Sequence, residues 1–168
     1  SVSSSASTVA PGGTATLTVT FSPTSAGTKN ATISISNNDS NEGTYSFNVT
    51  ANSFTASPEI NIQGGAGPSD IPSGSTTISD ALGTNFGTAP GTRTYTIQNL
   101  GTSNLTVSSV TSTLPDYTVS ISPTTITAGN FATLTIVFNP TTSGTRNSTI
   151  TVNNNDTNEG TYTFRVSA

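Results

Sequence analysis

The stretch FSPTSAGTKNATISISNNDSNEGTYSFNVTA, residues 21–51, decides the fold, because it returns almost unchanged as FNPTTSGTRNSTITVNNNDTNEGTYTFRVSA at residues 138–168. From 21 to 138 the offset is 117 residues, and the match extends upstream until Val2 aligns with Val119. Self-similarity at a fixed period is the signature of a repeat protein. The sequence therefore predicts two copies of one structural unit.

The domain organisation follows from this period, since 168 residues are more than one period and fewer than two. We expect residues 58–168 to form one complete repeat and residues 1–51 to be the C-terminal half of the repeat before it. Residues 52–57 carry neither copy's alternating pattern and are predicted to be a linker. A unit that starts in mid-repeat indicates a piece of a longer natural protein.

The repeated stretch has the pattern of β-strands. In residues 15–21 and 132–138 every second side chain is apolar, and most of the others are threonine, which is the pattern of a strand with one buried face. Short strands separated by Gly, Pro and Asn clusters are typical of antiparallel sandwiches, and no window has helical spacing. We therefore predict an all-β fold, an immunoglobulin-like antiparallel β-sandwich of seven to eight strands in 58–168, with part of 76–86 as strand.

The half-unit 1–51 is expected to supply only three of those strands. It would then expose apolar side chains that a complete sandwich buries, a patch that soluble proteins avoid. These side chains are Leu17, Phe21, Ile33 and Phe47. Another segment, from the same chain or from a neighbouring subunit in a filament, is expected to cover them.

Composition excludes several classes of protein. Serine and threonine account for 62 of the 168 residues, but the net charge is only −4 and the apolar residues alternate, so a disordered chain is not expected. Four scattered basic residues cannot form the positive surface that nucleic acid requires. No apolar run approaches 18 residues, so we expect no membrane insertion. Because histidine and cysteine are absent, the usual nucleophilic and zinc sites are absent too, and no enzyme is predicted.

Several spaced motifs together resemble a known family, the choice-of-anchor D type repeats. These are immunoglobulin-like domains, related to the abnormal-spindle and hydin class, that occur in tandem in large bacterial secreted and surface proteins. The motifs are Pro58-Glu59-Ile60, Phe86-Gly87, Tyr95 to Thr102, Phe138-Asn139-Pro140, Gly144-Thr145 and Asn155-Asp156. The resemblance covers 58–168 along its length and 1–51 as a half. It implies an extracellular stalk, spacer or adhesive module, such as those of gliding or surface adhesins.

The Asn-rich loop of each copy is the one candidate metal site. Oxygen-bearing side chains precede a glycine in both copies, which loosely matches the start of a calcium loop. The candidate ligands are Asp39, Asn41, Glu42, Asp156, Asn158 and Glu159. The same residue types also bend the backbone between two strands without any ion. Both interpretations, a calcium loop and a plain turn, stay open, and no other cofactor is predicted.

Other candidate sites concern sugars. Tyr117 lies outside the repeated strand pattern of residues 138–168 and next to Asp116, so it is either a core residue or a ligand contact. Six N-x-Ser/Thr sequons occur at Asn30, Asn38, Asn48, Asn104, Asn147 and Asn155, roughly the number expected by chance in so Ser/Thr-rich a chain.

Repetition favours reach and avidity over a single reactive site. We therefore predict a non-enzymatic structural and adhesive repeat of a large bacterial cell-surface or filamentous protein, whose partners are neighbouring repeats or subunits. The alternative is a module of a secreted protein that binds a surface glycan or calcium.

Overall fold

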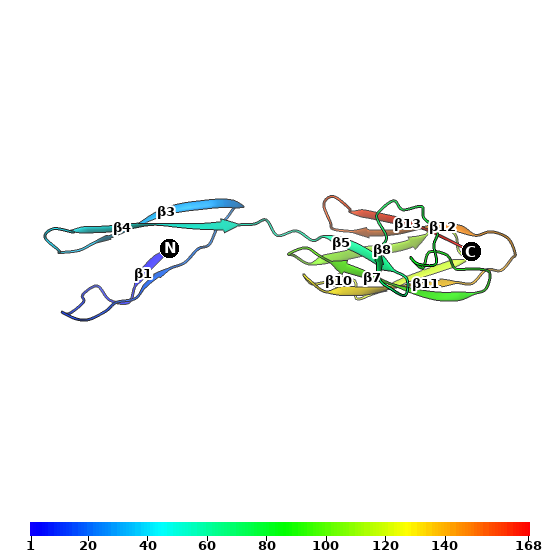
Figure 1. The fold of residues 1–168 in the computed structure, drawn as a ribbon, viewed down its shortest axis with the longest axis horizontal. Coiled ribbons are helices and arrows are strands. Elements are labelled where there is room, and N and C mark those ends of the chain that lie inside the picture. The colour runs from blue at the N-terminus through cyan, green and yellow to red at the C-terminus, as the bar shows by residue number, and fades with distance from the viewer. The chain divides into compact units, whose positions relative to one another are not determined.

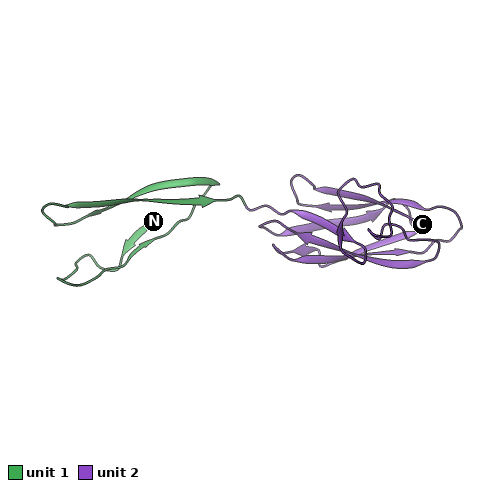
Figure 2. Ribbon diagram, viewed as in Figure 1, with its two compact units in different colours: residues 1–55 green, residues 56–168 purple.

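The computed structural model describes residues 1–168, and the chain divides into two compact units, residues 1–55 and 56–168 (Figure 2). Both units consist of β-strands and connecting segments, with no helix. The absence of helices follows from the alternating apolar pattern, which places one face of each strand inward.

Unit 2 is a sandwich of two antiparallel sheets (Figure 1). The five-stranded sheet has the order β6-β5-β7-β11-β9, and the four-stranded sheet has the order β10-β8-β12-β13. The strands are β5 Ile60–Gly64, β6 Ser69–Asp70, β7 Gly91–Asn99, β8 Leu105–Ser112, β9 Tyr117–Ser122, β10 Thr125–Ile126, β11 Phe131–Phe138, β12 Asn147–Asn154 and β13 Thr161–Ser167. This architecture confirms the predicted all-β, immunoglobulin-like sandwich. It has nine strands where seven to eight were predicted, and two of the nine, β6 and β10, are only two residues long.

The core of unit 2 is made by the inward side chains of both sheets. Leu134 and Ile136 of β11 are fully buried, as are Ile150 and Val152 of β12 and Phe164 of β13. The threonines between them face outward, as the period of two requires. The predicted alternation is therefore correct for every strand of the second copy.

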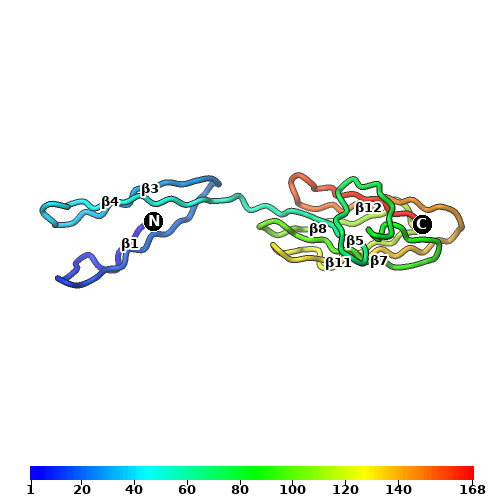
Figure 3. The backbone as a smooth tube through the Cα atoms, in the orientation of Figure 1, coloured from blue at the N-terminus to red at the C-terminus, as the bar shows by residue number.

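Residues 73–86 differ from the prediction, because they contain no strand where we expected one in part. The segment runs along the outer edge of β13, and parallel bridges join Ser75 to Phe164 and Asn85 to Ser167. Figure 3 shows the path of the chain in this region. The N–H of Gly74 donates to Thr163 O at 2.7 Å, and the N–H of Phe86 donates to Ser167 O at 2.7 Å. Between these points Thr84 bonds back to its own loop, through Oγ1 to Thr77 O. The segment thus covers an edge that would otherwise be free to pair with another chain.

Unit 1 consists of two separate antiparallel ribbons. Strand β1 Val2–Ser4 pairs with β2 Leu17–Val19, and β3 Gly27–Ser36 pairs with β4 Thr44–Ser53. The expected number of strands was three, so β1 corrects the prediction. It exists because Val2 pairs with Val19, as Val119 pairs with Ile136 in β9 and β11 of unit 2.

The boundary between the units also differs slightly from the predicted linker. Strand β4 continues through Ser53, because Asn52 pairs with Thr28 and its Oδ1 accepts a hydrogen bond of 2.7 Å from the Thr28 hydroxyl. Two residues predicted as linker therefore belong to a strand.

Candidate functional site

The Asn-rich loop of unit 2 joins β12 to β13 and is closed by its own side chains. The Asn154 amide donates to Glu159 O at 2.9 Å, while its Oδ1 accepts from the N–H of Asp156 at 2.7 Å. Asp156 Oδ1 in turn accepts from the N–H of Asn158 at 3.1 Å. These are the bonds by which Asn and Asp stabilise a turn.

Unit 1 contains the same loop between β3 and β4, with the same bonds. Asn37 donates to Glu42 O at 2.8 Å and accepts from the N–H of Asp39 at 2.7 Å. Asp39 Oδ1 accepts from the N–H groups of Asn41 at 3.0 Å and Glu42 at 3.3 Å. Turn formation therefore accounts for one oxygen of each aspartate.

The second oxygen of Asp156 has a different role. It accepts a 2.9 Å hydrogen bond from the backbone N–H of Ile60, the first residue of β5. The neighbouring Asn155 holds another strand, since its Oδ1 accepts from the N–H of Thr106 at 2.7 Å and its amide donates to Asn104 O at 3.1 Å. The loop thus fixes β5 and β8, which come from opposite sheets, at one end of the sandwich.

Three carboxylates meet beside this loop. One oxygen each of Glu59, Asp156 and Glu159 lies within 4.8 Å of the other two. Desolvation, followed by repulsion from Asp156 and Glu59, raises the pKa of Glu159 above its usual value. Oxygen groups at this spacing are the ligand type that calcium prefers. The structure therefore brings together two of the predicted ligands, Asp156 and Glu159.

The third carboxylate, Glu59, was not predicted. It lies 97 residues before Asp156 in the chain, and no local spacing relates the two. Asn158, which was predicted, contributes its backbone N–H to the turn instead. In unit 1 the corresponding residues, Asp39 and Glu42, are exposed and have no third acidic residue beside them.

Tyr117 is a core residue, one of the two roles that its sequence position left open, and its burial argues against the other role, a ligand contact. Its side chain is only 2% exposed, and its ring centroid lies 4.8 Å from that of Phe138 and 5.4 Å from that of Phe86. Its hydroxyl donates to Arg146 O at 2.9 Å, and burial raises the pKa of Tyr117 to about 12. Asp116 forms an ion pair of 2.8 Å with Arg146 Nε. Both residues therefore serve the packing of this end of the sandwich.

All six asparagines of the sequons lie in exposed positions. Several of their side chains are nevertheless engaged across strands. The hydroxyl of Thr50 donates to Asn30 Oδ1 at 2.9 Å, and that of Thr32 donates to Asn48 Oδ1 at 2.8 Å. Glycosylation of these residues stays a prediction.

No helix of the structure is long and apolar enough to cross a membrane.

Comparison with known families gives two matches. The profile described as "HYDIN/CFA65/VesB-like, Ig-like domain" matches residues 73–168, more than half of the chain. The profile described as "Abnormal spindle-like microcephaly-assoc'd, ASPM-SPD-2-Hydin" matches residues 1–45. The two matches fall on the two copies of the internal repeat. A search of curated proteins found no match.

Two solved structures are similar to the chain. A protein of unknown function from Porphyromonas gingivalis W83 is 16% identical with a TM-score of 0.52, and the match covers 92% of this chain and 70% of that one. The ASH/PapD-like domain 7 of human CEP192 is 14% identical with a TM-score of 0.41, over 68% of this chain and 85% of that one. At these identities the first of them supports the fold alone.

Proposed function

Because the chain belongs to the HYDIN/CFA65/VesB-like family of Ig-like domains, a family of generally non-catalytic modules, we propose that it serves as a structural repeat. The proposed role is that of a shaft or stalk segment of a large bacterial cell-surface or filamentous protein, located outside the cell. In this role the repeats hold an adhesive surface away from the cell and multiply weak contacts.

The observation that carries this proposal is the internal repeat itself. Many residues 117 positions apart occupy corresponding strands or turns in the two units, as Asn37 and Asn154 do. Repeating one domain lengthens a protein without creating a site that only one copy has. The polar groups of the repeated loop are used to hold strands and turns.

Adhesion measured as a function of repeat number tests the proposal. Cells or beads displaying one, two, four and eight copies of 58–168 should show binding that increases with copy number. Soluble copies should have no high-affinity ligand of their own. If a single soluble copy competes fully with the longest array, the module is a receptor and the stalk proposal fails.

A second candidate role is calcium-dependent stiffening, favoured by the gathering of Glu59, Asp156 and Glu159. A bound cation would remove the repulsion among the three carboxylates and stabilise unit 2. Millimolar calcium should then raise the unfolding temperature of unit 2, and EDTA should reverse the change. Magnesium, which demands a more regular geometry, provides the control. If the unfolding temperature is the same with calcium, with EDTA and with magnesium, unit 2 has no calcium-dependent stiffening.

A further inference from the structure

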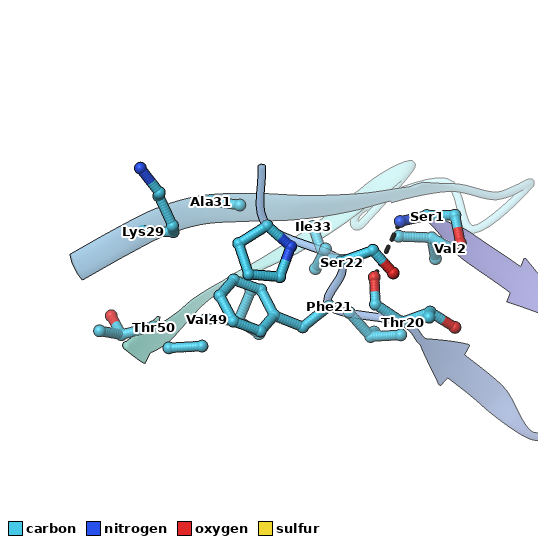
Figure 4. Close-up of a pocket in the computed structure, with 13 residues that line it drawn as sticks. Ser1, Val2, Thr20, Phe21, Ser22, Lys29, Ala31, Ile33, Val49 and Thr50 are labelled. Atoms are coloured by element: carbon cyan, nitrogen blue, oxygen red, sulfur yellow. Dashed lines mark hydrogen bonds between the residues drawn. The ribbon is translucent and has the colours of Figure 1, made fainter. Parts of the chain in front are cut away.

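Unit 1 contains a hollow between its two ribbons. The hollow has a volume of about 340 Å³, and Phe21, Ile33 and Val49 are among the side chains that line it (Figure 4). Phe21 is 46% exposed, whereas its counterpart in unit 2, Phe138, is 3% exposed. Of the four side chains predicted to be exposed, Phe21 and Phe47 are exposed, whereas Leu17 is half-buried and Ile33 is buried.

Unit 2 shows which elements cover this surface when it is complete. There β11 pairs with β9 on one side and with β7 on the other, and β12 pairs with β13 and β8. The counterparts β2 and β3 in unit 1 pair only with β1 and β4, so each has one free strand edge. Free edges present rows of N–H and C=O groups that another strand satisfies.

The short strand β10 of unit 2 shows what the missing partner strand does. Residues 125–126 form β10 in unit 2, where they pair with β8 and Ile126 is 1% exposed. Residues 8–9 occupy the same position in the first copy, but they form no strand and Val9 is 48% exposed. The difference lies in the partner, because unit 1 has no strand equivalent to β8.

The loop of unit 1 also carries the polar groups that hold strands β5 and β8 in unit 2. Asp156 Oδ2 receives the N–H of Ile60, and its counterpart Asp39 has only Oδ1 engaged. Asn155 is bonded to the start of β8, whereas the side chain of its counterpart Asn38 makes no hydrogen bond. Lys29 stands where Arg146 pairs with a carboxylate.

We propose that the open face of unit 1 is a docking site for a β-strand segment of the type of residues 57–117. The counterparts of β7 and β8 pair with the free edges of β2 and β3. Asp39 and Asn38 accept hydrogen bonds from the first residues of the counterparts of β5 and β8. Lys29 forms an ion pair with the counterpart of Asp116. The occupant is a further copy of the first half of the repeat.

The same segment of a second molecule is not the occupant. Residues 57–117 of that molecule already supply β5 to β8 to its own unit 2. Lending them to a neighbour would uncover the core of that unit, including Leu134 and Phe164, for no net gain in buried surface. The proposal rests on the comparison of the two units and does not depend on the stalk function.

A completed chain tests the proposal. Residues 57–117 are placed directly before Ser1 of the 168-residue chain, because Ser1 aligns with Thr118 in the 117-residue register. Amide hydrogen exchange is then compared between the two proteins. The amides of β2 and β3 should exchange at least about tenfold more slowly in the completed chain, since their free edges become hydrogen-bonded. Unchanged exchange rates overturn the proposal.

The substitution Asp39→Asn tests the specific role of the loop. It leaves an oxygen for the turn but places an amide donor where the carboxylate would receive the strand N–H. In the completed chain it should accelerate exchange in β3 by about tenfold, and in the 168-residue chain it should have little effect. Ser40→Ala, in the same exposed loop, is the control and should change neither protein. Equal effects of Asp39→Asn in both proteins contradict the docking role.

Two further measurements test which segment occupies the open face. Adding residues 57–117 as a separate polypeptide to the isotope-labelled 168-residue chain should shift amide signals of unit 1 and leave those of unit 2 in place. Mass measurement of the 168-residue chain alone should give a monomer in dilute solution. A stable dimer with protected β2 and β3 amides would show that a second copy occupies the face, and the proposal fails.

Discussion

Replacement of Phe164 by alanine should strongly destabilise unit 2. Its side chain is 1% exposed, and its ring centroid lies 5.4 Å from that of Tyr95 on the opposite sheet. A buried phenylalanine removes about 200 Å² from water, at about 25 cal/mol per Å². Alanine keeps part of this buried area, and the substitution leaves a cavity. Together these effects lower the free energy of unfolding by about 3–5 kcal/mol. The matched control is Phe131→Ala, on the outward face of β11 and 65% exposed, which should change stability by less than about 0.5 kcal/mol.

Equilibrium urea unfolding followed by tyrosine fluorescence measures both changes. The chain has four tyrosines, and a Tyr45→Phe background leaves only Tyr95, Tyr117 and Tyr162, all in unit 2. The midpoint should fall strongly for Phe164→Ala and stay in place for Phe131→Ala, with similar slopes. Equal losses for the two variants, or a larger loss for Phe131→Ala, would refute the assignment of the inner and outer faces.

Three further changes test separate features of unit 2. Tyr162→Phe removes the hydroxyl that donates to Ile71 O and should cost about 1–2 kcal/mol in urea unfolding. Gly64→Ala would place a Cβ 2.2 Å from Leu82 O, so it should lower the unfolding temperature sharply or prevent folding, as calorimetry would show. The pKa of Glu159 is raised, so the folded state binds the proton of Glu159 more tightly than the unfolded state does. The unfolding free energy should therefore fall as the pH rises above 4.5. Urea titrations at several pH values should show a smaller fall for Glu159→Gln.

Each of these changes has a control in the same chain. Tyr45→Phe, at the counterpart position in unit 1, should leave the stability of unit 2 unchanged. Gly67→Ala should be tolerated, because nothing lies within 4 Å of the added Cβ. Glu42→Gln should leave the pH profile of unit 2 as it is, since Glu42 belongs to no carboxylate group. If a control substitution changes stability or its pH dependence as much as the matched test substitution does, the explanation given for that test substitution is wrong.

The strands of the repeated stretch could be predicted because their burial repeats every two residues. The inward positions of β11, β12 and β13 are those that the alternation in 132–138 and its neighbours indicated. The segment 73–86 could not be predicted in the same way, because its path is fixed by isolated backbone bonds to β13. Such bonds depend on tertiary position and leave no period in the sequence.

The candidate site was predictable only in its local part. The Asn37 and Asn154 turns follow from residue type, since Asn and Asp bond the backbone two residues on. The bond from Ile60 to Asp156 and the approach of Glu59 join residues almost one repeat apart, so no local motif marks them. Tyr117 lies outside the stretch from 138 to 168, and its burial depends on Phe86, which comes from a segment without a strand pattern.

Small-angle X-ray scattering of arrays with one to eight complete repeats tests whether these modules act as spacers. An eight-residue strand at about 3.3 Å per residue, with loops at both ends, gives each sandwich a length of about 30–40 Å. We predict that the maximum dimension of the array increases by a constant amount close to this length for every repeat added. A maximum dimension that levels off after two or three repeats would contradict it, because the modules would then collapse on one another.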